Sequence, residues 1–110
     1  MPSVSVRYIV DDVDDAIAFY VGRLGFTEVM HPAPTFAMLR RDDLRLVLSK
    51  PGGGPGGGAA MPDGSVPTPG GWNRFAIEVS GIDDLLGSLE AAGVHARSPV
   101  IESPSGKGVR

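Results

Sequence analysis

The chain has 110 residues, 42% of them apolar and 21% charged, an ordinary composition for one small globular domain or for two modules that share a core. Its net charge of -3 argues against the basic surface of a nucleic-acid-binding protein. Cysteine is absent, which excludes disulfides, thiolate nucleophiles and zinc–thiolate sites.

No apolar run approaches the roughly 20 residues that a membrane-spanning helix needs. The N-terminal residues also lack the long apolar stretch of a secretory signal. We therefore expect a cytoplasmic protein that binds neither a membrane nor nucleic acid.

The first quarter of the chain predicts a strand and then an amphipathic helix. Apolar and polar residues alternate over residues 4–10, the pattern of a half-buried strand. Asp11 or Asp12 is suited to cap the following helix, and Gly25 is suited to end it. The apolar residues of this helix fall on one face, namely Val13, Ile17, Tyr20 and Leu24.

Three further strands are predicted before the composition changes. The first covers residues 26–31 and is interrupted by Pro32 and Pro34. The other two, residues 35–40 and 44–49, flank a polar turn at 41–43 and form a hairpin. The first half of the chain therefore reads as a βαβββ module.

Residues 51–71 differ from the rest of the chain because nine of them are glycine and five are proline. A long segment of this kind is either a linker or a functional flap. It lacks the Gly-Lys-Ser/Thr sequence of a phosphate-binding loop.

The remaining residues predict a second, shorter copy of the first module. Alternation over 75–79 predicts a strand, and the leucines after Ile82 predict a helix that ends before Gly93. A short strand is expected at 94–97 and an extended stretch at 99–101, after which few residues remain for further strands.

The two copies are related by an offset of 69 residues, since Val10-Asp11-Asp12-Val13-Asp14-Asp15 returns as Val79-Ser80-Gly81-Ile82-Asp83-Asp84. An internal repeat identifies which positions are spatially equivalent. The offset pairs Ser5 with Arg74 and Ile9 with Glu78. Because acidic residues recur at both helix starts, helix capping explains them better than acid–base catalysis does.

Residues 8–12, 18–20 and 24–26 together resemble the N-terminal signature of the glyoxalase / bleomycin-resistance / extradiol-dioxygenase superfamily, the vicinal oxygen chelate fold. Residues 61–64 and 69–74 resemble the segment between the modules in one of its subgroups. The resemblance implies an α+β fold in which two βαβββ modules form a curved mixed sheet around a cup. It also implies a homodimer.

The resemblance divides the chain into a first βαβββ module at 1–50, a linker or flap at 51–71 and a second module at 72–110. The second module is incomplete in this chain, because relatives continue with a further turn and strand.

Metal-dependent relatives place a His or Gln near the start of strand one, a His at the matching place in module two, and a Glu on the last strand of each module. Here the two starting positions hold Ser5 and Arg74, and residues 44–49 hold no carboxylate. Arginine has no lone pair to donate, and a serine hydroxyl is a poor ligand for transition metals. We therefore expect no metal and no cofactor.

The two histidines do not supply a metal site, because His31 and His95 lie at no metal-binding spacing. We interpret both as surface or half-buried residues.

Candidate ligand-binding residues are those that the resemblance places on the face lining the cup: Arg7, Phe36, Met38, Trp72, Arg74 and Glu78. Each has a structural alternative. Arg74 and Glu78 could form an internal ion pair, and Arg7 carries the same ambiguity. Phe36 and Met38 could be core residues, and Trp72 could be a core or interface residue.

We interpret the chain as a metal-independent protein that binds a mid-sized, aromatic small molecule in the cup, with no catalytic residues assigned. One alternative is a metal-dependent lyase, isomerase or dioxygenase of the same fold with a displaced site. The other is a module whose function is its dimer interface.

Overall fold

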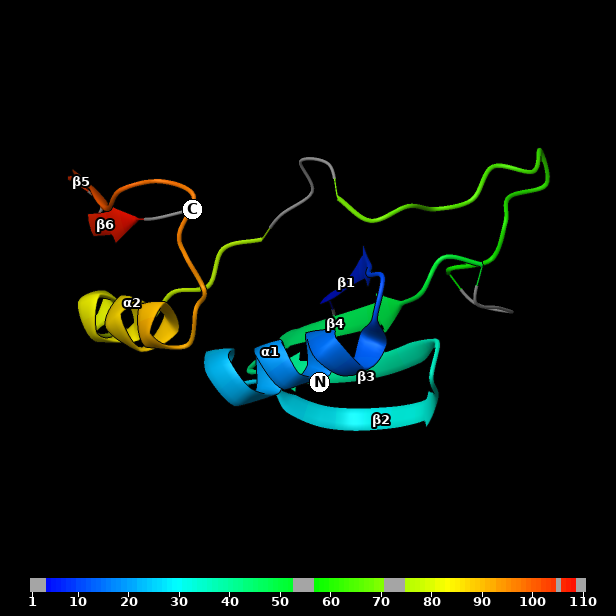
Figure 1. The fold of residues 1–110 in the computed structure, drawn as a ribbon, viewed down its shortest axis with the longest axis horizontal. Helices are drawn as coiled ribbons and strands as arrows, with labels where there is room; N and C mark the ends of the chain where they lie inside the picture. Colours follow the sequence, from blue (N-terminus) through cyan, green and yellow to red (C-terminus); the bar gives the residue numbers. More distant parts are fainter. Residues whose placement is uncertain (1–3, 53–56, 71–74, 105, 109–110) are drawn as a thin grey trace. The chain divides into compact units, whose positions relative to one another are not determined.

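The computed structural model describes residues 4–52, 57–70, 75–104 and 106–108 (Figure 1). The chain divides into two compact units, Met1–Asn73 and Arg74–Arg110. Each is described here by itself. Trp72 and Arg74, two of the predicted ligand-binding residues, lie outside the described residues.

The first unit is built on a four-stranded mixed sheet in the order β1-β4-β3-β2. These strands are β1 (Val4–Ile9), β2 (Thr27–Ala33), β3 (Phe36–Arg41) and β4 (Leu44–Ser49). β1 runs parallel to β4, whereas β3 is antiparallel to both of its neighbours. With helix α1 between β1 and β2, the predicted βαβββ order of the first module is confirmed.

Helix α1 (Val13–Leu24) begins and ends as its sequence predicts. The Asp15 backbone N–H donates to the Asp12 carboxylate over 3.0 Å, so Asp12 is the cap. At the other end Gly25 has φ 75°, a left-handed conformation that favours glycine. The Phe26 N–H donates to the Tyr20 carbonyl over 3.1 Å and turns the chain into β2.

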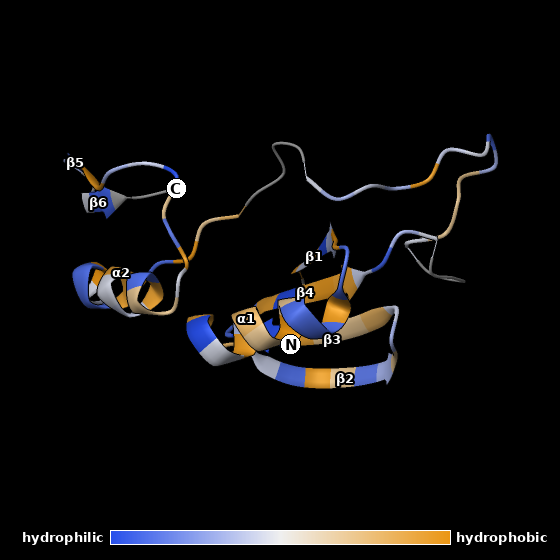
Figure 2. Ribbon diagram, viewed as in Figure 1, coloured by the Kyte–Doolittle hydropathy of each residue, from blue (hydrophilic) through white to orange (hydrophobic). Residues whose placement is uncertain are grey.

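The core of the first unit lies between α1 and one face of the sheet (Figure 1). Four residues that face α1 from the two central strands are inaccessible to water, namely Ala37, Leu39, Leu46 and Leu48. Val13 and Phe26 complete this core from outside the strands, at 1% and 3% exposure. Figure 2 shows the apolar stretches of β2, β3 and β4 in orange and tan.

The aromatic residues of α1 seal one side of this core. The Tyr20 ring meets the Phe26 ring edge to face at 5.4 Å between centroids. Burial, with a smaller contribution from nearby Tyr8, raises the pKa of the Tyr20 hydroxyl above its ordinary value. The neutral phenol is therefore the form that the fold favours.

One expectation for the first unit is wrong. The strand predicted at 26–31 does not end at Pro32 but continues to Ala33. The pairing between β2 and β3 has irregularities between Glu28 and Met30 and between Met30 and Ala33. Because β2 is an edge strand, a proline at such an irregularity removes no hydrogen bond that the sheet requires.

The second unit contains α2 (Ile82–Ala91) and a short antiparallel pair, β5 (Ile101–Ser103) with β6 (Gly106–Gly108). The helix is confirmed, and Gly93, at φ 81°, follows it as predicted. The N-cap is Gly81, the repeat equivalent of Asp12, and it makes no side-chain cap hydrogen bond. No residue of α2 is fully buried, although Leu85, Leu86 and Leu89 are half-buried.

Two strands predicted for the second unit are absent, because residues 75–79 and 94–97 have no regular secondary structure. Alternation alone does not make a strand. A strand also needs a hydrogen-bonding partner, and neither segment has one among the described residues. The β5–β6 pair was not predicted from the sequence.

Candidate functional site

The candidate site is the face of the sheet that α1 does not cover, called the site face below. Residues paired across a ladder point to the same side of a sheet, so the register defines this face in three rows. The rows are Ser5–Arg45–Arg40–Thr27, Arg7–Val47–Met38–Met30 and Ile9–Ser49–Phe36–Ala33.

The structure places Arg7, Phe36 and Met38 together on this face, as the resemblance implies. Arg7 and Met38 lie in one row on either side of Val47, and Phe36 lies in the next row. Both apolar side chains are partly accessible, so each has surface available to a ligand. Their role in binding stays a prediction.

Arg7 is held in place from two sides. Its Nη1 donates to the Ser49 hydroxyl over 3.2 Å, across the β1–β4 ladder. From above, Gly57 lies so close that a Cβ added there would overlap the guanidinium. A larger residue at position 57 would displace the Arg7 guanidinium from this position.

The glycine-rich segment is therefore partly folded onto the sheet. Gly58 is buried, and its carbonyl accepts a hydrogen bond from the Gly52 N–H over 2.6 Å. Gly58 directly follows Gly57, the residue that lies against Arg7. Among its described residues, the segment is thus in contact with the candidate site.

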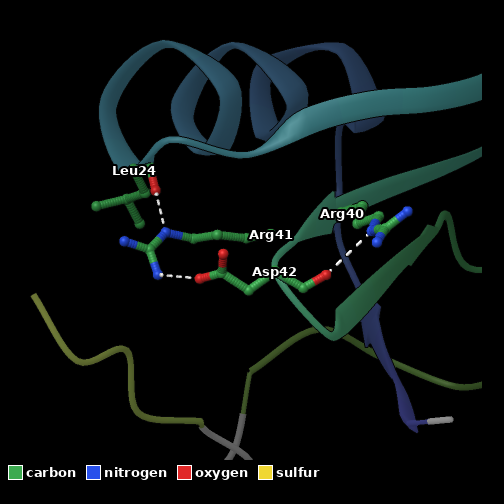
Figure 3. A network of polar contacts seen from close by, with 4 residues as sticks. All are labelled: Leu24, Arg40, Arg41 and Asp42. Carbon is green, nitrogen blue, oxygen red and sulfur yellow. Dashed lines mark hydrogen bonds and ion pairs between the residues drawn. The ribbon is translucent and has the colours of Figure 1, made fainter. Parts of the chain in front are cut away.

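An arginine row lies at the end of the site face nearest the β3–β4 turn. Arg40 and Arg45 are directly opposite each other on β3 and β4. Arg41, the next residue, points away from Arg40 (Figure 3). Its Nε donates to the Leu24 carbonyl over 3.1 Å, and its Nη1 lies 3.5 Å from the Asp42 carboxylate.

The β3–β4 turn fixes this arrangement. It consists of Asp42 and Asp43 alone, and Asp42 has φ 53°. Two-residue hairpins require such left-handed residues, and aspartate tolerates that conformation better than most. The Asp42 carbonyl accepts a hydrogen bond from Arg40 Nε over 3.0 Å (Figure 3).

An open depression of about 590 Å³ lies beside this turn. Its lining combines the arginine row with the β2 edge and the end of α1: Gly25, Thr27, Val29, Arg40, Arg41 and Asp42. Its volume is in the range of small-molecule sites.

The residues of the site face do not fit a divalent metal. Ser5 is exposed, and its ladder neighbour on β4 is Arg45. In the part of the chain that the structure describes, no three His, Asp or Glu residues gather closely enough to hold a metal ion.

Each histidine lies beside a carboxylate of its own unit. His31 Nε2 lies 3.4 Å from the Asp14 carboxylate at the start of α1. This nitrogen is buried and has no hydrogen-bond partner among the described residues. His95 Nδ1 lies 2.8 Å from the Glu90 carboxylate within the second unit.

Glu78 is exposed in the second unit, in a segment without regular structure. The predicted pair with Arg74 lies outside the described residues. The sequence analysis missed Arg40 and Arg45 as candidates, although both belong to predicted strands.

A sequence model of the Glyoxalase/Bleomycin resistance protein/Dioxygenase superfamily matches residues 3–109. The chain belongs to this superfamily. No curated protein is a significant match to the sequence. No helix among the described residues is long and apolar enough to cross a membrane.

Solved structures of the superfamily share the fold over most of the chain. A superfamily member from Sphaerobacter thermophilus DSM 20745 is 26% identical, with a TM-score of 0.70 over 96% of this chain and 82% of that one. A bleomycin-binding protein from bleomycin-producing Streptomyces verticillus, complexed with copper(II)-bleomycin, is also 26% identical, with a TM-score of 0.55 and the same coverage.

A lactoylglutathione lyase from Agrobacterium tumefaciens is 20% identical, with a TM-score of 0.66 over 98% of this chain and 84% of that one. At this identity the likeness shows the fold alone. Because one fold can carry different functions, only the site can decide between binding and catalysis.

Proposed function

We propose that this superfamily member binds a mid-sized, aromatic small molecule on the site face, without a metal ion. The observation that carries the proposal is the chemistry of that face. Met38 and Phe36 provide accessible apolar surface on the same face as Arg7, and no described residue of the three rows is His, Asp or Glu. An apolar surface with a few placed polar groups is typical of a small-molecule site.

The side chains suit a flat, irregular ligand. Phe36 offers a ring face or edge for stacking, and Met38 adapts its shape to the ligand it contacts. Similarity to the bleomycin-binding protein supports binding as the function, since the solved structure of that relative is a complex with copper(II)-bleomycin.

The metal-dependent alternative finds no support on this face. Lewis-acid chemistry needs a bound cation. The β1 position where relatives carry a ligand is Ser5, and the β4 residues of the same face are Arg45, Val47 and Ser49. A cation beside Arg45 would also face an adjacent positive charge.

The test is a binding titration with a neutral aromatic fluorophore, N-phenyl-1-naphthylamine, before and after dialysis against a chelator. We expect the same affinity in both cases, and elemental analysis below one metal ion per chain. F36A and M38A each remove apolar contact area, so each should weaken binding about fivefold to tenfold.

The matched control is M61A, which truncates a methionine that is 58% exposed in the glycine-rich segment. It should bind the probe as the unmodified protein does. Loss of binding on chelation, or stoichiometric tightly held Fe, Mn, Ni or Zn, would contradict the proposal.

Homodimer formation remains a prediction from the superfamily resemblance. Light scattering on the purified protein tests it directly, with twice the chain mass of 11.4 kDa as the expected result.

A further inference from the structure

We propose that the natural ligand is an amphiphilic anion, an acidic group joined to an apolar body, and that Arg40 and Arg45 bind the acidic group. This inference rests on the proposed function and adds the chemical class of the ligand. Four observations carry it: the position of the two arginines, their lack of acidic partners, the order of polarity along the face, and the neighbouring depression.

The two guanidinium groups start from adjacent points on the sheet. Arg40 and Arg45 are directly opposite each other on β3 and β4, so their Cβ atoms lie about 5 Å apart. Ser5 and Thr27 flank them in the same row. The row thus presents two cations between two hydroxyl groups, a set of donors suited to a carboxylate, sulfonate or phosphate.

Neither arginine is neutralised by the described part of the protein. Arg41 has the Asp42 carboxylate within 4 Å, whereas no described Asp or Glu comes that close to Arg40 or Arg45. Arg40 uses only its Nε, on the Asp42 carbonyl, which leaves both of its Nη groups available. The Arg45 side chain makes no hydrogen bond to any described residue.

Arg40 and Arg45 lack an acidic partner among the described residues, although the chain has more acidic residues (13) than basic ones (10). Like charges directly opposite on one face of a sheet destabilise it. A bound anion between the two guanidinium groups would convert this repulsion into two charge-assisted contacts. The arrangement is therefore better suited to the bound state than to the free one.

The face becomes more apolar along the strands, with increasing distance from the β3–β4 turn. The row after the arginine row contributes Val47 and Met38, and the row after that contributes Phe36 and Ile9. Rows on one face are about 6.6 Å apart, so an apolar body of one or two rings spans them while the acid stays on the arginines.

The depression beside the turn gives the acid an approach from solvent. It is lined by Arg40 and Thr27 of the arginine row and is open to water. A charged group can thus reach the row while the apolar body lies on the strands. Arg7, held by Ser49 and Gly57, lies in the middle row and is a less available partner.

The experiment uses the full chain and two probes of nearly the same shape. 8-Anilinonaphthalene-1-sulfonate carries a sulfonate, and N-phenyl-1-naphthylamine does not. We expect the sulfonate probe to bind about tenfold more tightly at low salt, an advantage that shrinks as salt screens the charges.

R40Q and R45Q should each raise the Kd of the sulfonate probe about fivefold and leave that of the neutral probe unchanged. M38A should raise both. The matched control is R23Q, which removes the same charge from an exposed position at the end of α1. Circular dichroism spectra of all variants establish that they are folded.

The outcomes separate the two proposals. Equal affinity for both probes, unaffected by R40Q and R45Q, overturns the anion inference and leaves aromatic binding standing. No binding of either probe overturns both. An effect of R23Q as large as that of R45Q shows a general charge effect and also overturns the arginine site.

Discussion

The two copies of the repeat share a sequence signature but differ in what their helices do. Helix α1 lies on a four-stranded sheet and covers a water-free core. Helix α2 has the same acidic first turn and the same glycine after its end, yet it buries no residue completely. Local signals specify both helices, but among the described residues only α1 covers a buried core in its own unit.

The difference teaches that capping and periodicity determine where a helix begins and ends, while burial determines how much it stabilises the fold. The repeat preserves the first kind of information. It preserves less of the second, since α2 buries no residue completely. The caps also differ, because Asp12 caps α1 with its side chain and its equivalent Gly81 does not. Three pairs of measurements test this comparison, and a fourth tests the arginine row.

The largest difference is expected between L46A and L86A. Leu46 is fully buried, so L46A should lower the free energy of unfolding by about 3 kcal/mol through lost contacts and a cavity. Leu86 is half-buried on α2, and L86A should cost less than about 1 kcal/mol. Urea unfolding followed by circular dichroism measures both, and equal losses would show that the second unit has a comparable core.

The second largest difference in stability is expected between alanine substitutions at the two glycines that follow the helices. Gly25 and Gly93 both have positive φ, where a Cβ costs about 1–2 kcal/mol. G25A should lower the global stability of the first unit by that amount, because α1 is part of its core. G93A should only reduce helicity in α2, as hydrogen exchange would report. A global loss in G93A as large as that in G25A would contradict the comparison.

Removing the α1 cap should have a smaller effect. D12A leaves the Asp15 N–H without its 3.0 Å acceptor and should cost about 1 kcal/mol. D12G, which copies the residue at the equivalent Gly81, should cost only a few tenths of a kcal/mol. If D12A is neutral in thermal melts, capping does not distinguish the two copies.

The smallest expected effect is a gain in stability rather than a loss. R45Q removes the repulsion with Arg40 and should raise the free energy of unfolding by about 0.5 kcal/mol, even as it weakens anion binding. R23Q, with no like charge opposite it, should bring no such gain. A destabilised R45Q would mean that Arg45 serves the fold rather than a ligand.

Much of the first unit could be predicted from the sequence because its signals are local. Asp12, Gly25 and the alternation over residues 4–10 each determine structure within a few residues. The strands expected at 75–79 and 94–97 failed because pairing depends on a partner far along the chain, which alternation does not identify.

The arginine row was missed because the turn predicted at 41–43 gives the wrong register between β3 and β4. A three-residue turn at 41–43 sets Arg40 opposite Leu44, whereas the observed two-residue turn sets Arg41 opposite Leu44 and therefore Arg40 opposite Arg45. A change of one residue in a turn exchanges every cross-strand pair of the hairpin. The left-handed Asp42 that permits the shorter turn is only weakly marked in the sequence.

The parallel β1–β4 ladder has a consequence for how the first unit folds. β2, β3 and β4 are consecutive and join through short turns, whereas pairing Val4 with Leu44 closes a loop of about 40 residues. The three-stranded meander can therefore form early, with β1 docking afterwards onto an existing edge. Substitutions in β1 should then mainly accelerate unfolding, while substitutions in the β3–β4 hairpin should slow folding.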